Sequence, residues 1–325
     1  MKRREFIKLC GSSVAMTWPV TARAQQMPTI GLLGASTAQA WAGLTAVFHQ
    51  GLSDAGYIEG RNVAVEYRWV GGQYERLAQM ADELIRHPVS ILVAFTTPAA
   101  FAAKVATTTV PIVFTTISDP VQTGLVTSLS RPDGNITGIT YLSLELGSKH
   151  LELMREAIPT ATSVALLINP TNAATVPQRA VFQAAARTLG IDLHVMLASS
   201  SEELDAAFEH MARLRIGGLV LTGDPFLNSQ IERIAALALR NRLPSIYPSE
   251  RYPAAGGLMS YAGNAFEAYR QAGIYTGRIL KGEKPANLPV QQVTKVELII
   301  NLKTAKALGI SLPLALLGRA DEIIE

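Results

Sequence analysis

The chain has 325 residues, of which 48% are hydrophobic and 17% are charged, and its formal net charge is +3. This length is enough for two domains, and the composition is that of a globular protein, which excludes a disordered one. Residues 1–24 hold five basic side chains against one acidic side chain, an excess of four, so the charge of the remainder is −1. A remainder without basic excess lacks the electrostatic basis of nucleic-acid binding, and we expect no nucleic-acid partner.

Residues 1–24 have the pattern of a cleaved export signal. A basic start that contains Arg3 and Arg4 precedes the short apolar stretch LCGSSVAMTWPV, and Ala22 and Ala24 form an Ala-x-Ala cleavage site. The paired arginines resemble a twin-arginine signal, and an ordinary secretory signal is the alternative. We expect this segment to be removed and the product to be periplasmic.

We expect the remainder of the chain to have no membrane span and no disulfide. Its apolar runs all fall short of the roughly 18 residues that indicate a spanning helix. The only cysteine, Cys10, lies in the expected signal. A product without cysteine can persist in an oxidising compartment and can perform no thiol chemistry.

Apolar segments rich in Val and Ile alternate with helical patterns along the rest of the chain. Short strands separated by helices favour parallel sheets that are covered on both faces. The pattern restarts after a polar, glycine-rich segment at 131–140, so the sequence predicts an α/β protein with two similar doubly wound lobes of the flavodoxin or Rossmann type. The predicted strands cover residues 29–35, 63–69, 90–95, 111–117, 164–169, 191–198, 217–223, 244–247, 256–262 and 295–301.

The two sets of elements predict a ligand cleft between two lobes that are joined by a multi-strand hinge. We expect residues 27–138 plus about 257–283 in the first lobe, and residues 139–256 plus about 288–325 in the second. Hinges absorb backbone rotation at a few connecting positions. The expected connections lie at 131–140, which includes Gly134 and Gly138, near 250–257 and near 283–291.

Polar and aromatic residues follow the predicted strands of both lobes. In an open parallel sheet, ligands bind beyond the carboxyl ends of the strands. We therefore expect a ligand to contact side chains at these strand ends, which carry hydroxyl, amide, carboxylate or aromatic groups. The candidates chosen on this basis are Ser36, Thr37, Thr96, Thr97, Ser118, Asp119, Asn169, Asn172, Asp224, Phe226 and Tyr247.

The Thr97-Pro98 pair predicts a helix start at the cleft. Thr97 is suited to the N-cap and Pro98 to the first helical position. The free N–H groups of Ala99, Ala100 and Phe101 would then point at the cleft, where they can bind a carboxylate or a phosphate. The alternative is a capped helix whose end contacts only water.

Asp119 and Asp224 each precede a proline at the end of an apolar run. An ionised carboxylate only accepts hydrogen bonds, so two of them facing one cleft would hold an ammonium group between the lobes. The alternative is that each aspartate caps the turn that follows it.

The sequence contains no catalytic or cofactor-binding motif. Its five histidines have no close metal-ligand spacing. It has no Gly-x-Ser-x-Gly, no Walker loop and no Gly-x-Gly-x-x-Gly. We expect no catalytic residues, no metal and no cofactor, and an exported hydrolase or isomerase is the least favoured reading.

The sequence resembles the ABC transporter substrate-binding proteins of the ABC_sub_bind family, which have the type I periplasmic-binding fold. Relatives commonly show Gly-Thr-Pro where this chain has Thr96, Thr97 and Pro98, a difference that affects how closely the backbone approaches a ligand. The segments that carry the resemblance are 50–69 (QGLSDAGYIEGRNVAVEYRW), 96–114, 119–138, 243–262 and 284–313.

The resemblance implies a monomeric protein that captures a small polar solute by cleft closure and delivers it to an inner-membrane ABC permease with its ATPase. Some members take up aromatic amino acids, so an amino acid is the implied solute. Thr97 and Ser118 would bind its carboxylate, and Asp119 and Asp224 its amine. A sensor that presents the solute to a membrane signalling receptor is the alternative. The residues placed around the solute side chain are Trp41, Tyr141, Phe226 and Tyr247.

Overall fold

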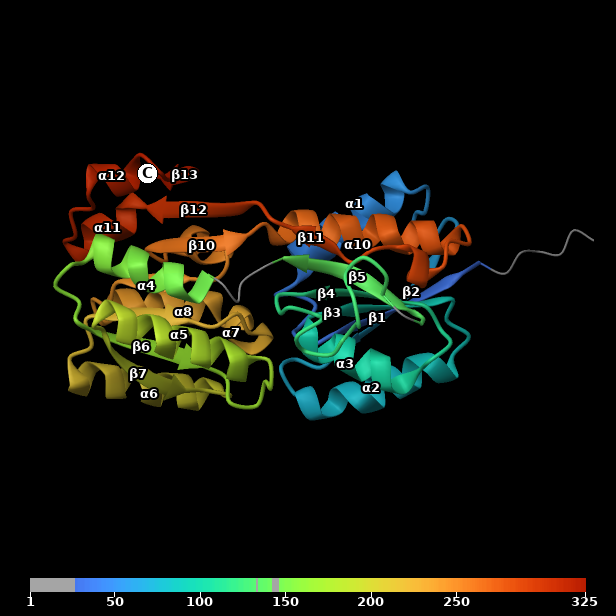
Figure 1. Ribbon diagram of the computed structural model, residues 1–325, viewed down its shortest axis with the longest axis horizontal. Coiled ribbons are helices and arrows are strands. Elements are labelled where there is room, and N and C mark those ends of the chain that lie inside the picture. Colours follow the sequence, from blue (N-terminus) through green and yellow to red (C-terminus); the bar gives the residue numbers. More distant parts are fainter. Residues whose placement is uncertain (1–26, 133, 142–145) are drawn as a thin grey trace, which may run out of the picture.

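The computed structural model describes residues 27–132, 134–141 and 146–325 and consists of two α/β lobes side by side (Figure 1). The predicted twin-arginine signal lies outside the described residues. In the part of the chain that is described, none of the helices combines the length and apolar character needed to cross a bilayer. The two predicted doubly wound lobes are confirmed by the two sheets.

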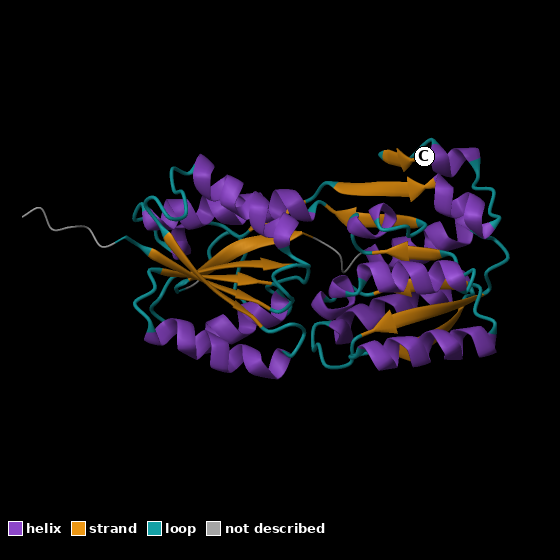
Figure 2. Ribbon diagram, turned by 180° about the vertical axis from the view of Figure 1, so that it is seen from behind, coloured by secondary structure: helices purple, strands orange, loops and turns teal. Residues whose placement is uncertain are grey.

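The first lobe is built on a fully parallel six-stranded sheet. Its central strands are buried on both faces because helices cover both sides (Figure 2). One face packs against α1 (Ala42–Asp54) and α10 (Ala265–Leu280), and the other against α2 (Leu77–Arg86) and α3 (Thr97–Ala106). The short helices η1 (Tyr74–Arg76) and η2 (Pro285–Asn287) complete the lobe. The strands, in spatial order, are β11 (Gln291–Val293), β5 (Ile136–Tyr141), β4 (Ile112–Thr116), β3 (Ile91–Phe95), β1 (Thr29–Gly34) and β2 (Ala64–Trp69).

The second lobe is built on a seven-stranded sheet in which only the β10–β12 pair is antiparallel. Its strands, in spatial order, are β13 (Glu322–Ile324), β12 (Val296–Asn301), β10 (Met259–Gly263), β9 (Ser245–Tyr247), β8 (Gly218–Leu221), β6 (Ser163–Ile168) and β7 (Asp192–Leu197). One face packs against α4 (Leu146–Ala157), α5 (Thr175–Leu189), α11 (Leu302–Leu308) and α12 (Leu314–Leu317). The other packs against α6 (Ser201–Leu214), α7 (Pro225–Ser229), α8 (Ile231–Arg240) and α9 (Arg251–Ala254).

Two glycines bring α1 and α10 into backbone contact, although these helices are far apart in the sequence. A Cβ atom at Gly51 would collide with the carbonyl oxygen of Arg270, and one at Gly273 would collide with the carbonyl oxygen of Phe48. The late helix α10 is thereby fixed onto the first lobe beside α1 (Figure 1).

The connections between the lobes lie at other positions than the sequence suggested. The segment 131–140, interpreted as a polar linker, contains most of the buried strand β5, and Gly138 is a packing residue whose Cβ would collide with the Phe114 carbonyl. Strand β10 belongs to the second sheet and β11 to the first. Among the described residues, the chain therefore crosses at Asn264 and again between β11 and β12.

Candidate functional site

Three cavities lie between the lobes, and each is lined by residues from both of them. Two are small, about 20 Å³ each, and share Trp41, Ile117, Tyr141 and Asn228 in their linings. The third is wider, about 710 Å³. Part of the predicted set of ligand-contacting residues lies at these cavities. The predicted residues that line at least one cavity are Trp41, Thr96, Thr97, Tyr141, Asn172 and Asp224.

Asp224 is a buried carboxylate whose hydrogen-bonding capacity is filled by the protein. It is the N-cap of α7, where its Oδ1 accepts from the N–H of Leu227 at 3.0 Å. The amide of Asn172 donates to Oδ2 at 2.8 Å, and that of Asn169 donates at 3.2 Å to Oδ1. Burial raises the pKa of Asp224, and these hydrogen bonds oppose the rise. The role of Asn169 is therefore to hold Asp224 in place, since Asn169 itself lines none of the three cavities.

Tyr74 of the first lobe supplies a further donor to Asp224 and closes a contact across the lobe boundary. Its hydroxyl donates to Asp224 Oδ2 at 2.9 Å and accepts from the N–H of Phe226 at 3.1 Å. The Phe226 ring faces Gly72 of the first lobe and is 7% exposed. We call Tyr74, Asp224 and Phe226 the interlobe contact. Tyr74 was not among the predicted residues, because it lies in η1, away from any strand end.

Asp119 does not pair with Asp224 across the cleft. Its Oδ1 accepts from the N–H groups of Val121 at 2.8 Å and Gln122 at 3.1 Å, so it caps the turn after β4. It shares no hydrogen-bond donor with Asp224 and lines none of the three interlobe cavities. The turn-cap alternative therefore describes Asp119, and the expected clamp of two aspartates is not formed.

The start of α3 carries a cluster of buried hydroxyls. The N-cap is Thr96, one residue before the predicted one, and its carbonyl oxygen accepts from the Ala100 N–H, which is thus not free for a ligand. Thr97 Oγ1 lies 2.6 Å from Thr116 Oγ1 and 3.4 Å from Ser118 Oγ. Ser118 therefore supports Thr97 from behind, whereas Thr97 itself lines the cleft.

Thr96 has a backbone conformation that favours glycine. Its φ of 95° and ψ of 157° fall in a region that side chains rarely adopt, at a cost of roughly 1–3 kcal/mol. Glycine, which lacks a Cβ atom, adopts this conformation without that cost. The Thr96 hydroxyl is buried and has no hydrogen-bond partner among the described residues.

The other predicted residues lie outside the linings of the three interlobe cavities. Ser36 is fully buried, and Thr37 Oγ1 accepts from the Ala40 N–H at 3.2 Å in an exposed turn. Tyr247 is fully buried and stacks on Tyr252 in the core of the second lobe, with ring centroids 4.2 Å apart. Neither these three residues nor Phe226 line an interlobe cavity.

Glu250 lines one of the small cavities and was not predicted. Both of its carboxylate oxygens are buried, and neither has a hydrogen-bond partner among the described residues. The same cavity is lined by Trp41, Tyr141 and Arg251. Burial raises the pKa of Glu250, and its own backbone N–H, the charge of Arg251 and the Ser249 hydroxyl oppose the rise, whereas the charge of Glu297 adds to it. Glu250 could have been suggested from the sequence by its position: it lies in the segment SERYP, two residues after Pro248, which follows the end of a strand.

Buried polar atoms without a partner gather around the two small cavities. Besides Glu250, they include the indole N–H of Trp41, the hydroxyl of Thr96 and the amide oxygen of Asn228. Buried polar groups in proteins are nearly always hydrogen-bonded. These atoms therefore offer two donors, the Trp41 N–H and the Thr96 hydroxyl, and several acceptors to a polar molecule between the lobes.

The wider cavity opens along the edge of the cleft and is mainly apolar. Its lining includes Leu77 and Phe101 of the first lobe and Val176 and Pro177 of the second. Tyr74 and Thr97 also line it, so it adjoins the interlobe contact and the start of α3.

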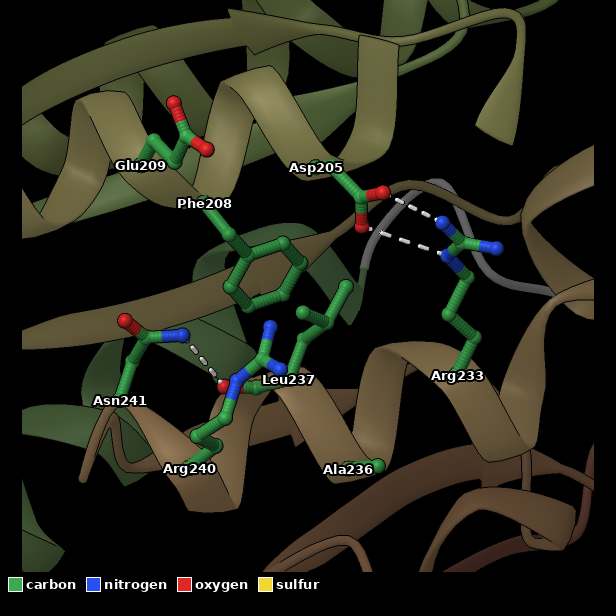
Figure 3. A pocket seen from close by; sticks show the side chains of 8 residues that line it. All are labelled: Asp205, Phe208, Glu209, Arg233, Ala236, Leu237, Arg240 and Asn241. Carbon is green, nitrogen blue, oxygen red and sulfur yellow. Dashed lines mark hydrogen bonds and ion pairs between the residues drawn. The ribbon is translucent and has the colours of Figure 1, made fainter. Parts of the chain in front are cut away.

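A further cavity of about 510 Å³ lies on the second lobe, between α6 and α8 (Figure 3). Two contacts form within its lining: Arg233 pairs with Asp205, and Asn241 donates to the Leu237 carbonyl at 2.8 Å. It contains no residue of the interlobe cavities. Within the described residues, His, Cys, Asp and Glu side chains nowhere gather in threes as a metal site requires.

The sequence matches the family described as "ABC transporter substrate binding protein" over residues 38–324. A curated relative, "Tyrosine-binding protein" of Clostridioides difficile, is 28% identical over 263 residues, which are 80% of this chain and 75% of the relative. A solved structure described as a conserved domain protein of Vibrio cholerae has a TM-score of 0.85 at 29% identity, covering 92% of this chain and all of that one. The ABC domain of Streptococcus pneumonia in complex with L-Trp has a TM-score of 0.83 at 24% identity, covering 91% and 99%.

Proposed function

We propose that this chain, which belongs to the ABC transporter substrate binding protein family, is the extracytoplasmic solute-binding component of an ABC importer. In this function it captures a small polar solute, an amino acid, between its lobes and presents it, as a monomer, to an inner-membrane permease with its ATPase. The observation that carries the proposal is the set of unpartnered buried polar atoms around the two small interlobe cavities. A polar solute would satisfy these atoms, which the protein alone leaves without hydrogen bonds.

Aromatic rings at the cleft favour an aromatic amino acid. Trp41 and Tyr141 line the small cavities, and both contact Tyr269 of α10, with ring centroids 5.4 and 6.3 Å apart. Aromatic rings pack well against other rings, in edge-to-face or offset arrangements. The curated relative is named for tyrosine, and one structural relative was solved with L-Trp. We therefore expect tyrosine or tryptophan among the solutes.

Capture requires the lobes to move. A cavity of about 20 Å³ has room for about one water molecule, so an amino acid enters only when the lobes separate. Among the described residues, the chain crosses between the lobes at Asn264 and between β11 and β12. Such short connections between rigid lobes act as hinges. We infer that solute binding and lobe closure are coupled.

Calorimetry and native mass spectrometry test this function. Gently purified protein, analysed by native mass spectrometry, should carry a bound amino acid. Titration calorimetry with L-tyrosine and L-tryptophan should give saturable heat, and D-tyrosine provides a control of the same composition. A protein that carries no solute and gives no heat with any of the twenty amino acids would refute the proposal.

Export is tested separately at the start of the chain. Because Arg3 and Arg4 are paired ahead of an apolar stretch, we propose the twin-arginine route to the periplasm. Replacing both arginines by lysine keeps the charge and should leave unprocessed precursor in the cytoplasm, detected by fractionation and blotting. Normal processing of the double variant would favour the ordinary secretory route.

A further inference from the structure

We propose that Glu250 binds the ammonium group of the solute, so that the cleft selects molecules that carry a primary amine. This inference rests on the proposed function and names the chemistry by which the site recognises its solute. It differs from the expectation drawn from the sequence, in which Asp119 and Asp224 held the amine.

The burial of Glu250 without a partner is the first argument. Its two carboxylate oxygens are shielded from solvent and make no hydrogen bond of normal geometry among the described residues; its own backbone N–H and the Ser249 hydroxyl offset only part of the cost of burial. A buried carboxylate without compensation is strongly unfavourable, and proteins normally pair such a group with a cation or with donors. Glu250 lines a cavity between the lobes, so a partner for it can come from a bound solute.

The surroundings of Glu250 suit a cationic group. Trp41 and Tyr141 line the same cavity, and aromatic faces attract cations at short range. Arg251 also lines this cavity, but among the described residues neither it nor Glu250 takes part in an ion pair. The lining of the cavity thus includes one acidic and one basic residue that form no ion pair with each other. A zwitterionic head group has the two charges that complement them.

The other two carboxylates near the cleft are already satisfied. Asp224 accepts from Leu227, Asn169, Asn172 and Tyr74, which fills both of its oxygens. Asp119 accepts from two backbone N–H groups of its own turn. Of these three acidic residues, only Glu250 lacks a donor, and this singles it out as the ammonium acceptor.

The test compares Glu250→Gln with the wild type by titration calorimetry. Within each series, the probes share one ring and differ only in their charged groups. In the first series, L-tyrosine carries both charged groups, tyramine only the amine, and 3-(4-hydroxyphenyl)propionate only the carboxylate. The second series is the corresponding set with an indole ring: L-tryptophan, tryptamine and 3-indolepropionate. Wild-type protein should bind the amino acid at least about 30-fold more tightly than its counterpart without the amine. Glu250→Gln should lose at least about 30-fold in affinity for the amino acid and retain its weak affinity for the propionate.

Asp119→Asn is the matched control. It also replaces one carboxylate by an amide near the cleft, but Asn is itself a good cap, so affinity should remain that of the wild type. Because Glu250→Gln removes a buried charge and keeps the side-chain size, its melting temperature without solute should equal or exceed that of the wild type. Selectivity between amine-bearing and amine-free probes is measured on the wild type alone, so it does not depend on the variant folding.

The outcomes separate this inference from the proposed function. If the wild type binds an amino acid but Glu250→Gln keeps full affinity, or if amine-free probes bind as tightly, Glu250 is not the ammonium acceptor and the importer function stands. If native mass spectrometry finds a carried solute without an amine, Glu250 is again not an ammonium acceptor, and the importer function again stands. If the wild type binds no probe and carries no solute, both proposals fail.

Discussion

Replacing Tyr74 by Phe should shift the protein toward an open arrangement of its lobes. The substitution keeps the ring but removes two hydrogen bonds across the lobe boundary, one from the Tyr74 hydroxyl to Asp224 at 2.9 Å and one from the Phe226 N–H to that hydroxyl at 3.1 Å. With the lobes apart, water can bond to all of these groups. The loss of these two hydrogen bonds therefore destabilises only the closed state and leaves the open state unchanged.

The size of the effect follows from the two bonds. A hydrogen bond to a charged acceptor contributes about 1.5–3 kcal/mol and an ordinary one about 1 kcal/mol. Together they destabilise the closed state by about 2.5–4 kcal/mol, which is roughly a 70-fold to 900-fold change in the closed-to-open ratio. Because a solute held by both lobes needs the closed state, its affinity should fall by up to the same factor.

Two measurements check this prediction. Spin labels on the two lobes report the interlobe distance without solute, and titration calorimetry reports the affinity for the carried solute. Tyr57→Phe is the control, since Tyr57 precedes β2 at the edge of the first sheet away from the cleft. If Tyr74→Phe matches Tyr57→Phe in both distance and affinity, the interlobe contact does not control closure.

Three further substitutions test particular features of the fold. Gly273→Ala should lower the free energy of unfolding in urea by roughly 1–3 kcal/mol, because its Cβ would collide with the Phe48 carbonyl; an unchanged midpoint would contradict the helix contact. Thr96→Gly should raise the melting temperature in calorimetry by relieving the φ of 95°, a net gain of about 1 kcal/mol, and a decrease would show that the threonine is unstrained. Burial lowers the pKa of His150 to about 4, and its Nε2 lies 2.7 Å from the Tyr261 carbonyl oxygen. The unfolded chain takes up this proton below about pH 6.5, so the unfolding free energy should fall by about 3 kcal/mol from pH 6.5 to 4. In His150→Gln that part of the pH dependence should vanish, and an identical pH profile would argue against the buried neutral ring.

The buried strands could be predicted because continuous apolar runs carry their own signal. IVF in β4 and VALLI in β6 are examples, and both lie where the sequence placed them. Strand β5 was missed because Thr137, Gly138 and Thr140 interrupt its apolar pattern. Their burial depends on tertiary partners: Thr137 Oγ1 donates to the Leu288 carbonyl, 151 positions away. No local pattern predicts such a bond.

The same limit applies to the site. Residues directly after strands, such as Thr97 and Asp224, could be located because the fold class fixes where strand ends meet. Tyr74 and Glu250 could not, since their roles depend on the approach of the two lobes and on which carboxylate the protein leaves unpaired. The predicted ammonium clamp of two aspartates was wrong for this reason. Equivalent positions in the sequence do not decide whether local donors already satisfy a carboxylate.

The contact between α1 and α10 has a consequence for synthesis of the chain on the ribosome. Helix α1 ends at Asp54 and α10 begins at Ala265. At roughly 5–20 residues per second, the intervening stretch of about 210 residues takes about 10–40 s to make. During that time Leu44, Phe48 and Leu52 of α1, buried in the finished protein, lack part of their cover. The first lobe to emerge is thus completed late, and until then its exposed apolar surface is open to chaperones or to aggregation.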